Sequence, residues 1–221
     1  MDENTILFFD LDDTIYPKSS GLWDAIGKRI DLYIYEKLAF PQNDVPAIRK
    51  NLFSRYGTTL RGLQIEYGID PYDYLAFVHD IPLDQYLNPN PKLNQMLEQL
   101  PNSKYIFTNS DSNHATRVLD SLEINPQHFT KIIDILSVSP FCKPHKEAFY
   151  TALTLIEPTT SDYLLIDDNI HNIETAENLG WDAIYVNEDG INPNSFKMIR
   201  SISELTTYFE NEKPKDKFSE S

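Results

Sequence analysis

Short apolar runs alternate with segments of helical periodicity along most of this chain. Five runs of four or five residues are mostly apolar, β-branched or aromatic, which is typical of strands buried inside a parallel sheet. The segments between most of them repeat apolar residues every three or four positions, which indicates amphipathic helices. This alternation predicts a parallel α/β sheet flanked by helices. The predicted strands are Ile6–Phe9, Lys104–Thr108, Lys131–Ile135, Tyr163–Ile166 and Ala183–Val186.

The segment between the first two strands is predicted to be helical throughout. Polar residues that start helices recur there, and two glycines stand where helices end. We therefore divide the chain into an α/β core (1–17 and 92–212), a helical insertion (18–91) and a charged tail (213–221) that we expect to be disordered. The predicted starts and stops are Gly21, Asp44 with Pro46, Gly57, Thr58 or Thr59, Gly68, and Asp70 with Pro71.

Further helices are predicted after each later strand and at the end of the core. Ser201 and Glu204 have the spacing of a capping box ahead of the last one. An insertion after the first strand emerges beside the carboxyl end of the sheet, so the helical segment is expected to cover that edge as a lid. The predicted core helices begin near Asn90, Asp111, Pro144, His171 and Ser201.

Composition narrows the possible partners. The formal net charge is −15, from 34 acidic and 19 basic residues, which argues against a nucleic-acid polymer or an anionic membrane. A small phosphate ester remains compatible, because one lysine and a metal ion can bind it whatever the global charge. Cys142 is the single cysteine, so an intrachain disulfide is impossible. We expect a soluble protein of the cytoplasm, with the nucleus as a second location, and leave the oligomeric state open.

Candidate chemistry begins where the first strand ends. Asp10 and Asp12 flank Leu11, and side chains alternate along a strand, so both carboxylates are expected on the same side. Two carboxylates this close repel each other, so one must take up a proton or a cation must lie between them. Either outcome supports catalysis.

Three other segments are expected to bring polar residues to the same edge. Thr108 and Asn109 follow the second strand, Lys143 follows the third, and Asp167 and Asp168 follow the fourth. The carboxyl ends of parallel strands meet at one edge of a sheet, where ligands of α/β proteins bind. The sequence therefore predicts one site with two pairs of acids, a hydroxyl and a lysine.

These motifs resemble those of the haloacid dehalogenase-like superfamily. Asp10-Leu11-Asp12-Asp13-Thr14 is similar to its DxDxT signature, and Thr108, Lys143 and Asp167-Asp168 match its other three motifs in order. The resemblance implies a Rossmann-like core, with residues 18–91 as the helical C1 cap. It also implies a Mg²⁺ ion on Asp10, on the backbone carbonyl of Asp12, and on Asp168.

The resemblance further implies a role for each residue. Asp10 is the expected nucleophile, and Asp12 the general acid and base, with a pKa that nearby carboxylates raise. Lys143 is expected to neutralise the transferring phosphoryl group, and Thr108 with the amides near Asn109 to bind its oxygens. Asp167 and Asn172 are expected to hold the catalytic residues in place without contacting the substrate. Asn172 stands where the superfamily often has an acid.

Cap and motif sequences together resemble the pyrimidine 5'-nucleotidase branch of fungal type, through FFDLDDTIYPKSSGLW, YGTTLRGL and DYLAFVHDIPLDQYL. This implies hydrolysis of nucleoside 5'-monophosphates, with UMP and CMP preferred. A phosphatase of a sugar phosphate or lysophosphatidate, a phosphomutase, and a catalytically silent regulatory or binding protein on the same scaffold are the alternatives. Dehalogenases of the superfamily lack the acid at Asp12, which favours a phosphatase.

Several conspicuous residues are given structural interpretations. Arg61 and Lys18 are interpreted as surface charges, and Cys142 as a small buried residue. Core packing is also the preferred interpretation of four cap aromatics that could otherwise stack on a base: Tyr67, Tyr72, Tyr74 and Phe77.

Overall fold

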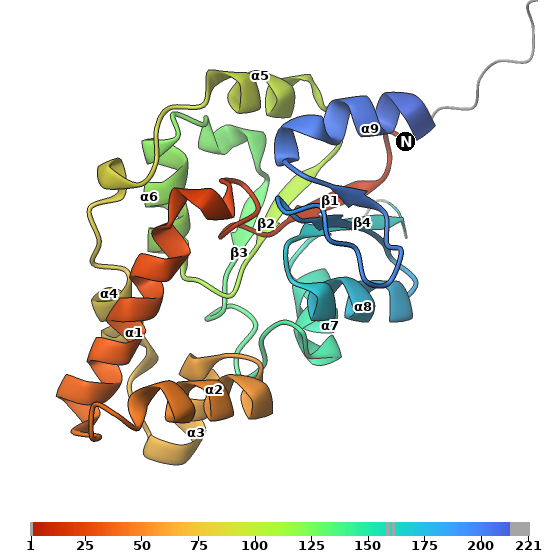
Figure 1. Cartoon of the computed structure of the whole chain (residues 1–221). Helices are drawn as coiled ribbons and strands as arrows, with labels where there is room; N and C mark the ends of the chain where they lie inside the picture. The colour runs from red at the N-terminus through yellow and green to blue at the C-terminus, as the bar shows by residue number, and fades with distance from the viewer. Residues whose placement is uncertain (1, 158–159, 161, 213–221) are drawn as a thin grey trace, which may run out of the picture.

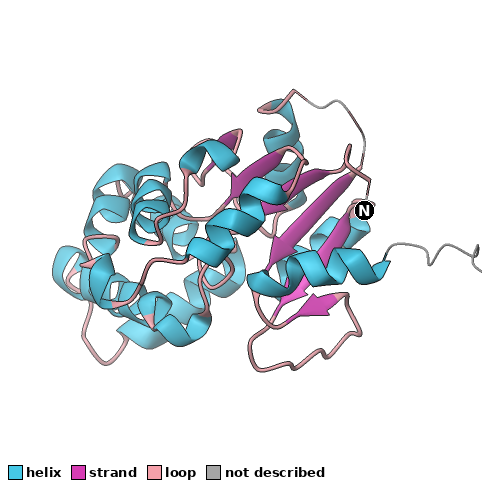
Figure 2. Ribbon diagram, turned by 90° about the horizontal axis from the view of Figure 1, so that it is seen from above, coloured by secondary structure: helices cyan, strands magenta, loops and turns pink. Residues whose placement is uncertain are grey.

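The computed structural model describes residues 2–157, 160 and 162–212. The prediction of a disordered tail over 213–221 lies outside the described residues. A sheet of six strands, all parallel to their neighbours, runs through the core in the order β3-β2-β1-β4-β5-β6 (Figure 2). The strands are β1 (Ile6–Phe9), β2 (Lys104–Phe107), β3 (Lys131–Ile133), β4 (Tyr163–Asp167), β5 (Asp182–Val186) and β6 (Met198–Ile199). The predicted parallel α/β fold is confirmed.

Both faces of the sheet are covered. Leu7 and Phe9 of β1 belong to one apolar core, and Ile6 and Phe8 belong to the other. This explains why the strand is an unbroken apolar run, since both sets of alternating side chains are buried. Helices α7 (Lys146–Thr154) and α8 (Ile170–Asn178) cover the Phe8 face, and the Phe9 face is covered by α5 (Pro91–Gln99), α6 (Ser112–Ser121) and α9 (Leu205–Glu212) (Figure 1).

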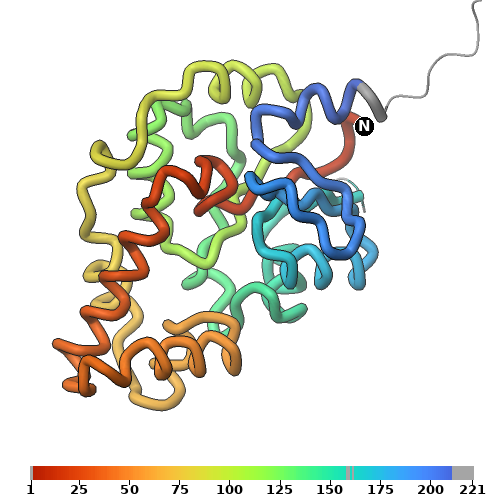
Figure 3. The backbone as a smooth tube through the Cα atoms, in the orientation of Figure 1, coloured from red at the N-terminus to blue at the C-terminus, as the bar shows by residue number. Residues whose placement is uncertain are grey.

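All four helices predicted in the insertion are present, and they lie together beside the core (Figure 3). Local capping explains their starts, because Thr58 accepts a hydrogen bond from Arg61 N and Asp70 accepts one from Tyr72 N. We call these helices the cap: α1 (Leu22–Leu38), α2 (Val45–Tyr56), α3 (Thr59–Tyr67) and α4 (Pro71–Val78). Short 3-10 helices cover Lys18–Ser20, Leu83–Gln85, Pro126–His128 and Ile202–Glu204.

Two details differ from the sequence-based expectation. Strand β6 was not predicted, because a strand of two residues is too short to give an apolar run in the sequence. The predicted capping box is also replaced: Ser201 caps a 3-10 turn by accepting from Ser203 N, and Glu204 accepts from Arg200 N. Within the described residues, none of the helices combines the length and apolar composition that crossing a bilayer requires.

Candidate active site

Asp10 lies at the carboxyl end of the central strand β1 and is almost completely buried. Its Oδ1 accepts a hydrogen bond from Lys143 Nζ at 2.8 Å, and its Oδ2 accepts one from the Thr14 hydroxyl at 3.1 Å. The central position of β1 and the turn after it therefore place a carboxylate within direct reach of a buried ammonium group.

Lys143 links Asp10 to the end of the neighbouring strand β4. Its Nζ lies 2.6 Å from Asp167 Oδ2, and the side chain is 1% exposed. Asn172 on α8 donates its Nδ2 to both Asp167 oxygens, at 2.9 and 3.0 Å. The Asp167 carboxylate is thus occupied by internal donors, and it fixes the position of Lys143.

Thr108 and Asn109 lie at the end of β2, on the other side of β1. The Asn109 side chain donates to Lys143 O at 2.9 Å and accepts from Lys143 N at 3.0 Å. It therefore holds the loop that carries Lys143, the lysine loop, against the sheet. Thr108 is 1% exposed, and its hydroxyl accepts from Ser110 N at 3.0 Å. The strand-end residues that the sequence predicted to converge do lie together in the structure.

Asp10, Asp167 and Asp168 form a cluster in which one carboxylate oxygen from each residue lies within 4.8 Å of the other two. Burial, opposed by Lys143 and reinforced by Asp167, raises the pKa of Asp10 to about 7. Burial and the Asp10 charge likewise raise the pKa of Asp168 well above its usual range. The single positive charge of Lys143 does not balance the charge of three carboxylates. A divalent cation can balance the remaining negative charge.

The donor set fits a hard cation such as Mg²⁺, which prefers carboxylate oxygens. Asp10 and Asp168 are the better placed ligands, because each Asp10 oxygen accepts one hydrogen bond whereas each Asp167 oxygen accepts two. The supporting role expected of Asp167 stays a prediction, and its hydrogen bonds to Lys143 and Asn172 are compatible with it.

Asp12 is held differently from Asp10. Its Oδ1 accepts from Tyr16 Oη at 2.6 Å and contacts His114 Nε2 at 2.9 Å, while its Oδ2 accepts from Ser110 Oγ at 2.5 Å. Burial alone would raise the pKa of Asp12, but His114, Ser110 and Tyr16 together hold it well below its usual range. The expectation of a raised pKa is therefore wrong, because the neighbouring donors outweigh the effect of burial.

Comparison with known proteins identifies the family. The model of the haloacid dehalogenase-like hydrolases matches residues 5–180, which is most of the chain. The chain belongs to the haloacid dehalogenase-like hydrolases. Phosphate metabolism protein 8 of Saccharomyces cerevisiae is 26% identical over 230 residues, spanning 90% of this chain and 71% of the yeast protein.

Solved structures share the fold. One of HAD-hydrolase YfnB from Bacillus subtilis, bound to magnesium, has a TM-score of 0.64 and 22% identity, and the match covers 95% of this chain and 100% of that one. An L-2-haloacid dehalogenase from Xanthobacter autotrophicus has a TM-score of 0.59 and 14% identity, with 94% and 99% covered. A HAD phosphatase from Thermococcus onnurineus has a TM-score of 0.59 and 15% identity, with 93% and 97% covered. Since both phosphatases and dehalogenases have this fold, the activity must be argued from the site.

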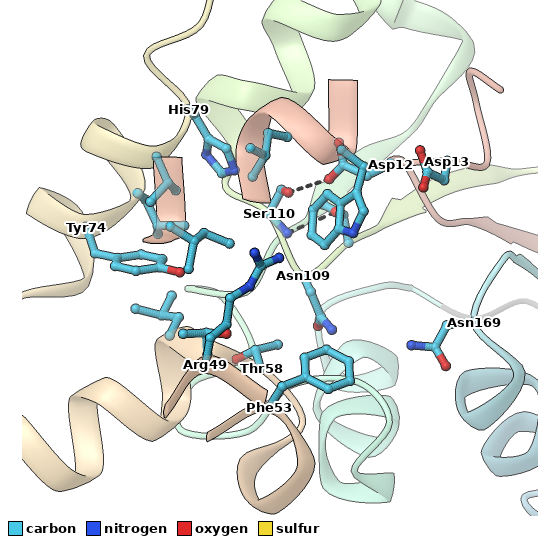
Figure 4. A pocket seen from close by; sticks show the side chains of 18 of the residues that line it. Asp12, Asp13, Arg49, Phe53, Thr58, Tyr74, His79, Asn109, Ser110 and Asn169 are labelled. Carbon is cyan, nitrogen blue, oxygen red and sulfur yellow. Dashed lines mark hydrogen bonds between the residues drawn. The ribbon is translucent and has the colours of Figure 1, made fainter. Parts of the chain in front are cut away.

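In this haloacid dehalogenase-like hydrolase, a cavity of about 510 Å³ opens between the core and the cap (Figure 4). Asp10, Asp12 and Asp168 line its core side. The cap side is lined mainly by apolar and aromatic residues together with two basic ones, among them Trp23, Ile26, Ile30, Arg49, Lys50, Phe53, Leu60, Tyr74, Leu75 and Val78. The cap helices thus cover the aspartates, as a lid would.

Some predicted roles in the cap need correction. Arg61 is buried rather than a surface charge, and it donates to the backbone carbonyls of Ile135 and Phe141. Tyr72 is 67% exposed, so core packing is wrong for this residue. Tyr74 packs edge-on against Tyr33, with ring centres 5.0 Å apart, as predicted. Lys18 is exposed and Cys142 is buried, both as predicted.

The sequence interpretation assigned no role to the three residues around Asp12. His114 stacks on His79 with ring centres 4.1 Å apart, and His79 Nδ1 lies 2.6 Å from Asp111 Oδ2. Tyr16, four residues after Asp12, could have been found from its spacing in the first motif. His114 carried no such signal, because 102 positions separate it from Asp12.

Proposed function

We propose that this haloacid dehalogenase-like hydrolase is a Mg²⁺-dependent phosphomonoesterase that acts on nucleoside 5'-monophosphates, UMP and CMP first. The observation that supports this activity is the second carboxyl group, Asp12, which faces the same cavity as Asp10. A phosphatase needs such a group to exchange a proton with the ester oxygen. Dehalogenases of the superfamily lack this acid.

Asp10 performs the first displacement in this proposal. One of its carboxylate oxygens bonds to phosphorus while the bond from phosphorus to the ester oxygen breaks, which forms an aspartyl-phosphate. Asp12 donates a proton to the departing oxygen. Its three donors keep it ionised in the free enzyme. The negative charge of the arriving phosphate raises its affinity for a proton, which it takes from solvent or from the phosphate monoanion as the substrate binds.

Water performs the second displacement. Asp12 takes a proton from water, the water oxygen bonds to phosphorus, and the bond from phosphorus to Asp10 breaks. Inorganic phosphate leaves, Asp12 releases its proton to solvent, and Asp10 is again a free carboxylate. Lys143, only 2.8 Å from Asp10, orients the nucleophile and offsets phosphoryl charge in both steps.

Asp10 and Asp168 would hold Mg²⁺ together with the backbone carbonyl of Asp12. The ion would supply positive charge against the phosphoryl oxygens. The yeast relative is named for phosphate metabolism, and the cavity volume lies within the usual range for small-molecule sites, about 300 to 1,000 Å³. Both support a small phosphate ester as the substrate.

Phosphate release from UMP, CMP, AMP, GMP, sugar phosphates and lysophosphatidate, with Mg²⁺ and with EDTA, tests the proposal. Asp10→Asn should lower kcat by at least about 10³-fold on every good substrate. Asp120→Asn, which changes an exposed acid on α6, is the matched control and should keep full activity. Absence of Mg²⁺-dependent turnover on the whole panel would instead favour the silent scaffold.

A further inference from the structure

One arginine of the cap is built into the wall of the cavity. Arg49 on α2 lines the cavity with its side chain 30% exposed, and Figure 4 shows its guanidinium directed into the pocket. Its Nη1 donates to Gly27 O at 3.0 Å and lies 3.2 Å from Asp31 Oδ1. One end of the guanidinium is therefore anchored to helix α1.

Gly27 makes room for this guanidinium. A Cβ added at position 27 would lie 3.0 Å from both Nη1 and Nη2 of Arg49, and 3.4 Å from Cζ. The guanidinium thus lies against the bare backbone of α1, where a larger residue would displace it. Glycine weakens a helix interior, so its presence in α1 is explained by the close approach of Arg49.

The other end of the guanidinium retains donors for a ligand. A guanidinium group carries five N–H donors in one plane. Among the described residues, hydrogen-bond partners are found for Nη1 of Arg49 and not for its Nε or Nη2. A half-buried cation with unused donors in a cavity favours a ligand with acceptor atoms in the same plane.

Two exposed aromatic rings line the same cavity as this arginine. Phe53 is four residues after Arg49 on α2 and is 46% exposed, while Trp23 is four residues before Gly27 on α1 and is 38% exposed. Residues four apart share a helix face, so each helix presents a ring beside its part of the arginine site. Both rings line the same cavity as Asp10 and offer faces on which a flat group can stack.

We propose that Arg49, anchored to Gly27 and Asp31, binds the base of the nucleotide by donating to a ring carbonyl oxygen. This proposal rests on the proposed function and assigns its specificity to one subsite. Uracil and cytosine both carry the carbonyl acceptor next to the sugar-bearing nitrogen, and adenine has no carbonyl. The acyl chain of lysophosphatidate has no flat ring to stack on Phe53 or Trp23, which disfavours that substrate.

Steady-state kinetics on UMP and on ribose 5-phosphate, which lacks the base, tests this subsite. Arg49→Met should lower kcat/KM for UMP by roughly 10- to 100-fold, mainly through KM, and leave ribose 5-phosphate within about twofold. Gly27→Ala should act in the same direction while keeping the arginine, because it displaces the guanidinium. Arg55→Met, which removes an exposed α2 arginine paired with Glu66, is the control and should change neither substrate.

Product inhibition provides a readout that does not depend on turnover of ribose 5-phosphate. Arg49→Met should raise the inhibition constant of uridine roughly 10-fold or more and leave that of inorganic phosphate unchanged. Unchanged uridine inhibition, or an equal loss on UMP and ribose 5-phosphate, would overturn the subsite while the phosphatase activity stood. Failure of the wild-type enzyme to hydrolyse any ester would overturn the proposed function itself.

Discussion

At the scale of single residues, the most informative group is Asp12 with its three donors. Tyr16 and His114 both reach Oδ1, and Ser110 reaches Oδ2, so the carboxyl group cannot rotate without losing hydrogen bonds. His114 Nδ1 is buried without a hydrogen-bond partner among the described residues, so the ring makes its polar contact with Asp12 through Nε2. His114 is therefore a positioning residue for the proposed acid and base.

Replacement of His114 should slow the chemistry more than it weakens binding. His114→Ala is expected to lower kcat about 10- to 100-fold with little change in KM, because Asp12 loses one of its orienting donors. His114→Gln should recover part of the loss, since its amide nitrogen can occupy the place of Nε2. Steady-state kinetics on the best substrate of each variant checks this.

The control for this series is His171→Ala, because His171 is 67% exposed on α8 and pairs with Glu174. It should keep wild-type kcat. An effect of His114→Ala on KM alone, or equal losses in the alanine and glutamine variants, would contradict a positioning role.

At the scale of elements, the contact between α3 and the loop after β3 joins the cap to the core. Arg61 Nε and Nη2 both donate to Phe141 O, at 3.1 and 2.8 Å, and Nη2 also donates to Ile135 O. Cys142 in the same loop donates its thiol to Tyr56 O at 3.4 Å. The loop that carries Lys143 is thus bound to the cap immediately before the lysine.

Gly57, between α2 and α3, adds to this contact. Its φ of 81° is in the left-handed region, and a Cβ there would lie 3.2 Å from Cys142 Sγ and 3.2 Å from Pro144 Cδ. A glycine is required both by the backbone conformation and by the close approach of the lysine loop.

Loss of Arg61 should therefore destabilise the folded protein strongly. Arg61→Met removes the charged donor from two buried carbonyls, which we expect to cost about 3 kcal/mol of unfolding free energy. For a chain of this size, that loss lowers Tm by roughly 6 to 12 °C. Thermal and urea unfolding followed by circular dichroism measure both quantities.

Arg55→Met is the matched control for stability, because Arg55 is 55% exposed and forms a surface ion pair. It should change the unfolding free energy by less than about 1 kcal/mol. Equal destabilisation by the two variants would show that Arg61 does not join the cap to the core.

The same elements show what the sequence could predict. Helix starts at Thr58, Asp70 and Asn90 were found because a helix-capping side chain contacts backbone amides only two or three residues away. Convergence of the strand ends followed from parallel topology alone. The burial of Arg61 was not found, because its acceptors lie 74 and 80 positions further along the chain.

Within the site too, residues that meet only through tertiary packing were not predicted. The carboxylates and Lys143 followed the strands and matched known motifs. The cavity residues Trp23, Arg49 and Phe53 were not singled out, because their shared surface arises only when α1 and α2 pack together. No local pattern distinguishes such residues from those of an ordinary amphipathic helix.

At the scale of the whole molecule, the active site concentrates the negative charge of an already acidic chain. The net charge is −15, and in the cluster of Asp10, Asp167 and Asp168 the first two are buried and Asp168 is partly buried. Burial and neighbouring charges raise the pKa of Asp10 to about 7, and burial with the charge of Asp12 raises that of Asp13 to about 7. Both groups have a usual value of 3.8.

These shifts set the sign of a pH effect on the metal-free protein. Between pH 4 and 7 the folded state binds more protons at Asp10 and Asp13 than the unfolded state does, so their contribution to stability falls as pH rises. Buried His79 acts in the opposite direction, because burial lowers its pKa below 6.5 and stability then rises with pH. The pH dependence of stability in EDTA alone is therefore a mixture of opposing contributions.

The difference in Tm with and without Mg²⁺ isolates the effect of the metal site, because the His79 contribution is common to both samples. Protons compete with the cation for Asp10 and Asp168, so the rise in Tm on adding Mg²⁺ should be larger at pH 7.5 than at pH 5.5, by several degrees at saturating metal. Asp168→Asn should remove most of that rise at both pH values, whereas Asp120→Asn should keep it. Thermal melts in EDTA and in Mg²⁺ measure the difference directly. A rise that is equal at the two pH values, or one that survives Asp168→Asn, would show that the cation does not bind at this cluster.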